Sequence, residues 1–282
     1  MVKYFSISLI AFFAALLTTP SYAADRIVSI GGSITEILFE LGLQDKIVAV
    51  DTTSLYPPET QEMPNVGYVR ALSAEPIIAL NPKLILYQDD AGPPETIEHL
   101  KSTGIQMVMI SDEPSEEGVF QKIDEVSQAV GMQEMGEQLI GNLKSKLDEL
   151  HDFLSYVDQP ASVLFILAFD QGTAMVAGKE TGADGIISLA KGENAVSKYN
   201  SYKPLSAESI LELDPDFILT TKRAISAFNS KDDVLSSPTL SLTRAAQNKN
   251  LIVMDGLLLL GFGPRLAEAA NELAQALYKE KR

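Results

Sequence analysis

Several residue types that build common functional sites are absent or scarce in this chain. It has no cysteine among its 282 residues, which excludes disulfides, thiolate metal sites and a cysteine nucleophile. It has no tryptophan and only two histidines, which disfavours a histidine-rich zinc site or a histidine-dependent catalytic triad. Cations are also few, with 22 lysines and arginines against 38 acidic residues and a formal net charge of −16. Nucleic acid and anionic lipid need concentrated positive charge, so neither is an expected partner.

The start of the chain has the features of a secretory signal peptide, predicted over residues 1–23. Lys3 precedes an apolar run at residues 7–17, and Ser21 and Ala23 are the small residues of a cleavage site. A membrane span needs about 20 apolar residues, and this run is shorter. We expect cleavage after Ala23 and, because no cysteine follows, no lipid anchor. The sequence therefore predicts a soluble periplasmic protein without stable membrane insertion.

In residues 24–282, short apolar segments typical of strands alternate with amphipathic segments typical of helices, and this pattern occurs twice along the chain. The pattern is typical of α/β folds with mostly parallel sheets. It predicts two similar lobes, residues 24–131 and 158–282. Apolar residues three and four positions apart indicate helices between them, split at Gly131, with one long linker helix at 132–157. Such a helix is stiff, so we expect two lobes at a fixed separation with a ligand in the cleft between them.

An internal repeat supports this division into two lobes. Residues 72–86 recur 133 positions later as residues 205–219, with nine of 15 positions identical. Both copies begin with the sequence Leu-Ser-Ala-Glu, which places Glu75 and Glu208 at equivalent positions. Two copies indicate a duplicated lobe, whereas solenoids need at least three repeats.

At three places the chain resembles a known family: GGSITE at residues 31–36, GYVRALSAE at 67–75 and GFGPR at 261–265. The family is the helix-linked class of periplasmic substrate-binding proteins of ABC importers, which carry vitamin B12, ferric siderophores or heme. The resemblance extends over residues 24–282 and is greatest for the heme-binding branch. It implies a binding protein rather than an enzyme, with heme as the transported ligand.

The resemblance implies that Tyr68 is the axial ligand of the heme iron and that Arg70 hydrogen-bonds it. A phenolate is a hard anionic donor suited to Fe(III), and tyrosinate ligates heme in other proteins. A nearby cation favours the phenolate over the phenol. If this segment is extended, side chains two positions apart share a face, which places Arg70 beside Tyr68. From spacing alone, a tyrosine that merely closes a loop is the alternative.

The opposite side of the predicted site is less defined by the sequence. Tyr199 and Tyr202 flank the C-terminal counterpart of Tyr68 in the repeat. We expect one of them, Tyr202 in the first instance, to line the macrocycle, with a tyrosine buried in a loop as the alternative. Neither histidine suits a second axial ligand, because His99 and His151 lie in a predicted surface helix and in the linker helix.

Heme also needs apolar surface and cations for its two propionates. Phe262 follows a run of four leucines and is predicted to face the ring, although such runs are often simply core. Arg265, Lys222 and Arg223 lie where strands of the C-terminal lobe are expected to end, which is the usual ligand edge of parallel sheets. Arg265 suits equally well a role in pinning the last helix.

Glu75 and Glu208 have a further implied role. In the resembling class, one glutamate of each lobe docks onto arginines of the two permease subunits. A helix-capping role is the alternative. We therefore expect heme, an inner-membrane ABC permease and its ATPase as partners, and a monomer. A ferric-siderophore or corrinoid carrier is the alternative function, and a chelatase-like enzyme is a weaker one.

Overall fold

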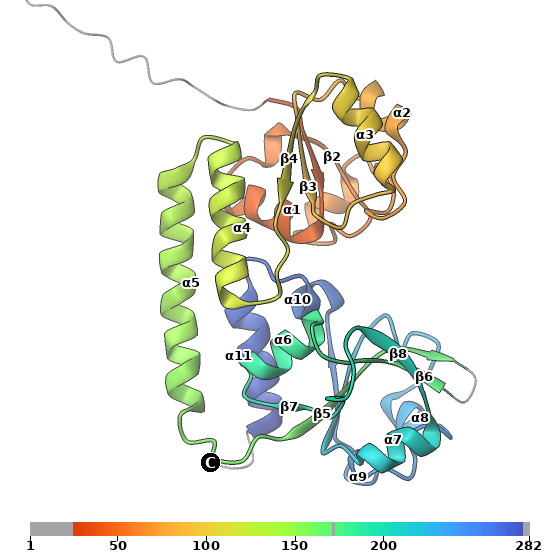
Figure 1. The fold of residues 1–282 in the computed structure, drawn as a ribbon. Helices are drawn as coiled ribbons and strands as arrows, with labels where there is room; N and C mark the ends of the chain where they lie inside the picture. The colour runs from red at the N-terminus through yellow and green to blue at the C-terminus, as the bar shows by residue number, and fades with distance from the viewer. Residues whose placement is uncertain (1–24, 171–172, 279–282) are drawn as a thin grey trace, which may run out of the picture.

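The computed structural model describes residues 25–170 and 173–278, so the predicted signal peptide lies outside the described residues. The first lobe, at the top of Figure 1, contains a parallel sheet. Its strand order is β2-β1-β3-β4. Every pairing is parallel, as the sequence predicts. The strands are short and apolar and are buried almost throughout in the central pair: β1 (Ile27–Ile30), β2 (Ile47–Val50), β3 (Leu84–Gln88) and β4 (Gln106–Ile110).

Helices cover both faces of this sheet, as parallel strands require. One core lies beneath α1 and α4, and a separate core lies beneath α2 and α3. The elements are α1 (Gly32–Glu40), α2 (Ala74–Ala79), α3 (Pro94–Ser102) and α4 (Glu116–Ala129), with 3-10 turns η1 (Gln44–Lys46) and η2 (Pro58–Glu62).

The second lobe contains a mixed sheet with the order β10-β9-β5-β6-β8, and β7 also pairs with β5. Here β6 runs antiparallel to both β5 and β8, which the alternating pattern did not predict. The connection between β5 and β6 is too short for the crossover that parallel pairing needs. The strands are β5 (Ser162–Asp170), β6 (Thr173–Ala177), β7 (Glu193–Asn194), β8 (Tyr202–Ser206), β9 (Phe217–Thr221) and β10 (Leu251–Met254).

Six helices accompany this sheet within the described residues. Most of them begin at a serine, threonine or aspartate whose side chain accepts a hydrogen bond from a backbone N–H group, which is the usual N-cap. They are α6 (Gly182–Leu189), α7 (Ala207–Leu213), α8 (Lys231–Leu235), α9 (Arg244–Gln247), α10 (Gly256–Leu260) and α11 (Leu266–Tyr278). None of the helices in residues 25–170 and 173–278 is long and apolar enough to cross a membrane.

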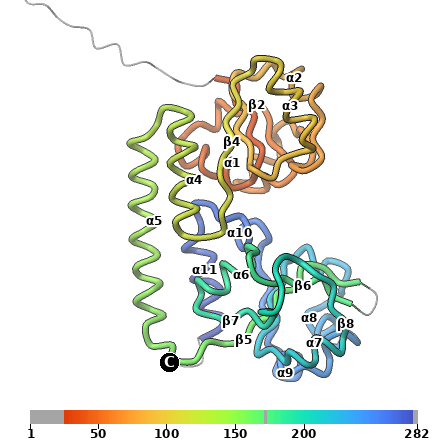
Figure 2. Tube along the Cα trace, in the orientation of Figure 1, coloured from red at the N-terminus to blue at the C-terminus, as the bar shows by residue number. Residues whose placement is uncertain are grey.

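The long helix α5 (Gln133–Leu154) joins the lobes and occupies the predicted position. Gly131 separates it from α4 with a φ of 72°, a conformation that glycine adopts without strain. Figure 2 shows α5 running from the first lobe to the second, with α11 beside its lower part. Because α5 packs against both α4 and α11, it contacts both lobes along its length.

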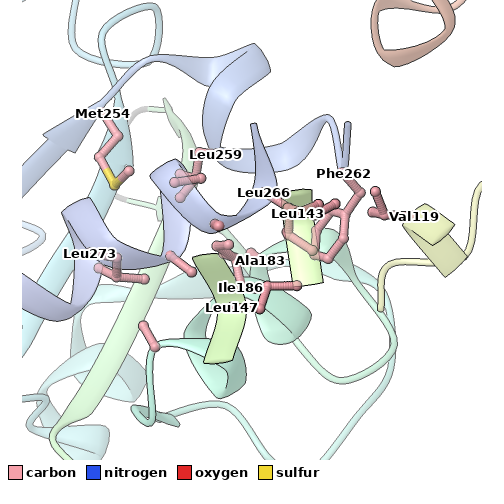
Figure 3. Packing of buried hydrophobic residues seen from close by; sticks show 14 of the residues in the cluster. Val119, Leu143, Leu147, Ala183, Ile186, Met254, Leu259, Phe262, Leu266 and Leu273 are labelled. Atoms are coloured by element: carbon pink, nitrogen blue, oxygen red, sulfur yellow. The ribbon is translucent and has the colours of Figure 1, made fainter. Parts of the chain in front are cut away.

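The lobes also share one apolar core, which a single connecting helix does not require. Leu143 and Leu147 of α5 lie beside Leu266 and Ile186 of the second lobe and Val119 of the first (Figure 3). Each fully buried leucine contributes about 1.5–3 kcal/mol to stability. The continuous core therefore holds the lobes together in addition to the covalent linker.

Candidate functional site

Tyr68 and Arg70 lie in a tight turn next to the carboxyl end of β3. Gly67 precedes them with a φ of 98°, and the Ala71 amide donates to the Tyr68 carbonyl at 2.8 Å. Val69, between the two, points into the core at 3% exposure, whereas Tyr68 is 43% exposed. The sequence placed Arg70 beside Tyr68 on the condition that the segment is extended, and in the structure a β-turn brings the two side chains together instead.

Within this turn, Arg70 Nη1 donates a hydrogen bond to the Tyr68 phenolic oxygen at 2.7 Å. The other arm of the same guanidinium forms an ion pair with Asp90, which follows β3. Burial disfavours the charged guanidinium, yet the Asp90 carboxylate and the Tyr68 hydrogen bond together raise the pKa of Arg70. A permanent cation is thus held against the oxygen of an accessible phenol, an arrangement that stabilises a phenolate.

Tyr202 is the residue of the opposite lobe that the sequence predicts to line the site. It is the first residue of β8 and is partly buried. Burial raises the pKa of its phenol, while hydrogen bonds from Thr181 and the Ala183 backbone and the charge of Arg70 act in the opposite direction.

Phe262 and Arg265 lie differently from their predicted roles. Phe262 is only 4% exposed, and its ring packs in the shared core against α6 (Figure 3). Its surface is filled by protein, so the structure does not favour the predicted contact with a ligand ring. The four leucines before it form α10, and Leu259 is fully buried. Core packing, the alternative interpretation of this run, accounts for their apolar character.

Arg265 is engaged by the other lobe. Its Nε and Nη2 each donate to a carboxylate oxygen of Glu36 at 2.7 Å, and its guanidinium lies 3.7 Å from the centre of the Tyr56 ring. Burial raises the pKa of Glu36 against the opposing effect of Arg265. With both arms of the fork bound to one carboxylate, Arg265 is a poor receptor for a propionate. It pins α11 to α1 instead.

The two histidines lie on helix surfaces, as predicted. His99 is exposed on α3, and His151 Nε2 of α5 lies 2.9 Å from a carboxylate oxygen of Glu116. No cluster of three or more histidine and acidic residues suited to a bare metal ion exists in the described part of the chain.

Glu75 and Glu208 occupy matching, exposed positions in the first turns of α2 and α7. Ser206 accepts the Ser209 amide and caps α7, whereas Ser73 makes no such bond to α2. Each glutamate comes two residues after the N-cap, and a capping box needs it at the third. Both side chains are exposed at equivalent places on the two lobes, and hydrogen bonds from its own backbone amide and from the Ser206 side chain lower the pKa of Glu208.

Sequence reasoning missed Lys122 and Asp112, which form a buried ion pair where the lobes meet. A signal for Lys122 was present. It falls three residues after Val119 and four before Val126, on the buried stripe of α4. A lysine on an apolar stripe indicates a buried partner, but only the fold shows that this partner follows β4.

Two α/β lobes that share a core along one long helix, with an accessible tyrosine–arginine pair beside the carboxyl end of β3, define a two-lobe binding protein of the helix-linked class. The chain belongs to the periplasmic binding protein family, whose profile matches residues 27–257. Members of this family are substrate-binding transport proteins, which supports a binding role over an enzymatic one.

Curated relatives cover most of the chain. The substrate-binding lipoprotein YvrC of Bacillus subtilis, which belongs to an ABC transporter, is 29% identical over 259 residues, covering 90% of this chain and 80% of YvrC. A vitamin B12-binding protein of Vibrio campbellii is 28% identical, covering 72% of this chain and 73% of its own.

Solved structures match the fold closely. The heme-binding protein RhuT of Roseiflexus sp. RS-1 has a TM-score of 0.87 at 37% identity, covering 92% of this chain and all of RhuT. HutB of Vibrio cholerae, also a heme-binding protein, has a TM-score of 0.81 at 35% identity, covering 90% and 99%. BtuF of Vibrio cholerae, at 23% identity and a TM-score of 0.78, shares the fold; its coverage is 92% and 99%.

Proposed function

We propose that this protein binds heme between its lobes in the periplasm and delivers it to an inner-membrane ABC importer. The observation that carries the proposal is the 2.7 Å hydrogen bond from Arg70 to the oxygen of the exposed Tyr68. The Arg70 guanidinium keeps its charge beside that oxygen, so it would complement the negative charge of a phenolate that binds ferric iron.

Tyr68 is the proposed axial ligand of the heme iron. Its phenolate would supply a hard anionic oxygen, the donor preferred by Fe(III). Tyr202 is proposed to line the macrocycle as a neutral phenol, since burial raises its pKa and so keeps it protonated. Arg70 is proposed to hold the Tyr68 phenolate rather than a propionate, because its guanidinium is already bound to that oxygen and to Asp90.

The propionates require other cations, since Arg265 is bound to Glu36. Lys222 and Arg223 are exposed and directly follow β9. The Lys222 amide donates to the Met254 carbonyl at 3.0 Å, which places it at the joint carboxyl end of β9 and β10. We assign the propionate role to this pair, at the edge where parallel sheets usually bind ligands.

A corrinoid carrier is the second candidate, favoured by the vitamin B12-binding relative at 28% identity. Heme is favoured by the higher identities of 37% and 35% to heme-binding structures. The Tyr68–Arg70 pair also favours heme, because a phenol oxygen beside a guanidinium is a suitable ligand for ferric iron. A ferric-siderophore carrier remains a further outcome of the test.

Delivery is proposed to use Glu75 and Glu208 as docking points for the permease. They are exposed, anionic and equivalent in the two lobes. A two-fold pair of acids is complementary to two equivalent permease subunits that carry cations. Export through a cleaved signal peptide, without a lipid anchor, is part of the same proposal and follows from residues 1–23 and the absence of cysteine.

An absorption titration of residues 24–282 with ferric heme tests the proposal, with cyanocobalamin and a ferric hydroxamate siderophore as competing probes. We expect saturation at a fixed stoichiometry with a tyrosinate-type spectrum, which Tyr68→Phe abolishes. Tyr202→Phe is the matched control and keeps that spectrum. Saturation by cyanocobalamin or by the siderophore, with no heme complex, would overturn the heme assignment.

A further inference from the structure

Lys122 is a buried cation that contacts both lobes, and ligand binding as proposed above does not use it. Its side chain has no exposed surface. Within the first lobe, its ammonium forms an ion pair with Asp112 and donates to the Ser33 hydroxyl at 3.1 Å. Toward the second lobe, it donates to the Phe262 carbonyl at 2.9 Å, with the Gly261 carbonyl at 3.5 Å. An ammonium has three donors, and all of them are used here.

The acceptors in the second lobe belong to residues 261–265, which we term the 261–265 turn, between α10 and α11. Phe262 has a φ of 45°, a left-handed conformation that side chains disfavour. Its ring is fixed from the other side by α6, where a Cβ at Gly185 would lie only 2.9 Å from the Phe262 Cζ. Phe262 therefore holds the turn in place from two sides: its ring packs against α6 of the second lobe, and its carbonyl accepts a hydrogen bond from Lys122 of the first lobe.

The turn also lies directly against α1 of the first lobe. A Cβ at Gly263 would lie 3.3 Å from the Cβ of Ser33. Two residues later, Arg265 forms its double hydrogen bond with Glu36. Lys122 thus acts where the 261–265 turn packs against the first lobe, so that a small displacement of this turn would change the angle between the lobes.

A short chain of contacts connects Lys122 to the tyrosine site. Asp112 accepts from Lys122 through one oxygen and from Gln88 Nε2 at 2.5 Å through the other. Gln88 is the last residue of β3, and Asp90, two residues on, holds Arg70. Lys122, which binds the second lobe, is therefore connected through Asp112 to the end of β3, and the residue that pairs with Arg70 follows this same end.

We propose that Lys122 is a positioning residue that fixes the orientation of the two lobes, and hence the spacing between Tyr68 and Tyr202, before any ligand binds. Apolar packing alone tolerates sliding, because it is not directional. Directed hydrogen bonds from one buried ammonium to both lobes select a single arrangement. The proposal concerns the geometry of the ligand-free chain and stands independently of which cargo is carried.

Distances between spin labels in the two lobes test the proposal. The chain has no native cysteine, so Glu95→Cys on α3 and Glu212→Cys on α7 provide two unique, exposed labelling sites. Lys122→Met removes the ammonium but keeps the apolar stem, and Asp112 is 27% exposed and can be hydrated instead. Lys144→Met on α5 is the matched control, since Lys144 is exposed and lies over the Phe120 ring of α4.

We expect one narrow distance distribution for the parent and for Lys144→Met, and a distribution shifted or broadened about twofold for Lys122→Met. A folded Lys122→Met protein, by circular dichroism, with the parent distribution would overturn the proposal. If Lys122→Met does not fold, Lys122→Gln replaces it. Its shorter amide reaches fewer acceptors, so broadening supports the proposal and an unchanged distribution overturns it.

The consequence for the ligand rests on the proposed function. In Lys122→Met we expect heme to dissociate about tenfold faster with an unchanged tyrosinate spectrum, since the ligand is intact but its opposing lobe is not held. A parent protein that binds no heme would count against the proposed function, while the label distances would still decide the role of Lys122.

Discussion

Glu36 and Arg265 are 229 positions apart in the chain, yet they form two hydrogen bonds of 2.7 Å across the junction of the lobes. Their side chains are 5% and 17% exposed. The pair therefore joins the start of α11 to α1 in a site with little water, where a charge without its partner is costly.

Removal of one member of this pair is expected to destabilise the protein more than removal of both. Arg265→Met leaves the Glu36 carboxylate buried and unpaired, which costs about 3–5 kcal/mol. Adding Glu36→Gln removes that charge, so the double variant regains part of the loss. Urea unfolding of the three proteins measures this, and equal losses in both variants would contradict it.

The same variants separate structure from ligand binding. Since Arg265 is bound to Glu36, we expect Arg265→Met to bind heme with unchanged stoichiometry at temperatures where it is folded. Lys222→Met combined with Arg223→Met is the comparison and is expected to weaken binding by about tenfold, through lost charge-assisted hydrogen bonds. The reverse ranking would restore the propionate role to Arg265.

Arg70 is expected to tune the affinity of the proposed iron ligand. Arg70→Leu removes a charged hydrogen bond to the Tyr68 oxygen, and because the site is exposed we expect the lower end of such effects, about tenfold weaker heme binding. Asp90→Asn is the matched control, since it leaves the Arg70–Tyr68 bond in place. An equal loss in both variants would indicate that only the local fold had changed.

Stability at high pH is expected to depend on Tyr202. Burial raises the pKa of this phenol in the folded state, whereas in the unfolded chain it is about 10. Above that pH the unfolded chain loses its proton first, so the stabilising contribution of Tyr202 declines as the pH rises.

Tyr202→Phe should therefore lose stability less steeply than the parent as the pH is raised from 9 to 11. Thermal unfolding at a series of pH values measures the slope. Tyr68→Phe is the comparison, and Tyr199 and Tyr278, whose pKa values are also raised by burial, contribute equally in all three proteins. Parallel pH profiles for Tyr202→Phe and the parent would contradict the assignment.

Glu75 and Glu208 are expected to matter for delivery and not for ligand binding. Their simultaneous change to lysine places like charges against the proposed permease arginines, which costs several kcal/mol and weakens association by about a hundredfold. Ligand-stimulated ATP hydrolysis by the importer in proteoliposomes measures this.

Glu95→Lys provides the control for docking, since Glu95 is also an exposed first-turn acid, on α3. It should leave the stimulation of ATP hydrolysis intact. Equal loss with Glu95→Lys would show that net charge, rather than these two positions, governs docking.

Much of the fold could be predicted because it depends on local rules. The long helix was expected at residues 132–157 and runs from Gln133 to Leu154. Its regular apolar spacing and the break at Gly131 depend only on neighbouring residues. The antiparallel β6 and β8 were not predicted, because short strands of polar and small residues carry no marker of pairing direction.

At the candidate site, the sequence indicated the Tyr68–Arg70 pair through close spacing, although the β-turn that joins them differs from the expected extended segment. Phe262 and Arg265 show the limit of such reasoning. Both belong to a motif shared with the resembling family, but their environments depend on residues far away in the chain: α6 surrounds the ring, and Glu36 binds the guanidinium.

The sequence by itself determined the composition of the protein, its general alternation of strands and helices, its duplicated units and the chemistry present in each motif. These follow from residue types and short-range spacing. The tertiary structure decided which side chains remain accessible and which are bound to other side chains or to backbone groups of the protein. It left Tyr68 exposed beside Arg70, closed Glu36 onto Arg265 and placed Lys122 between the lobes. Burial and pairing arise only when distant segments pack, because each buried charge must find its partner across the fold.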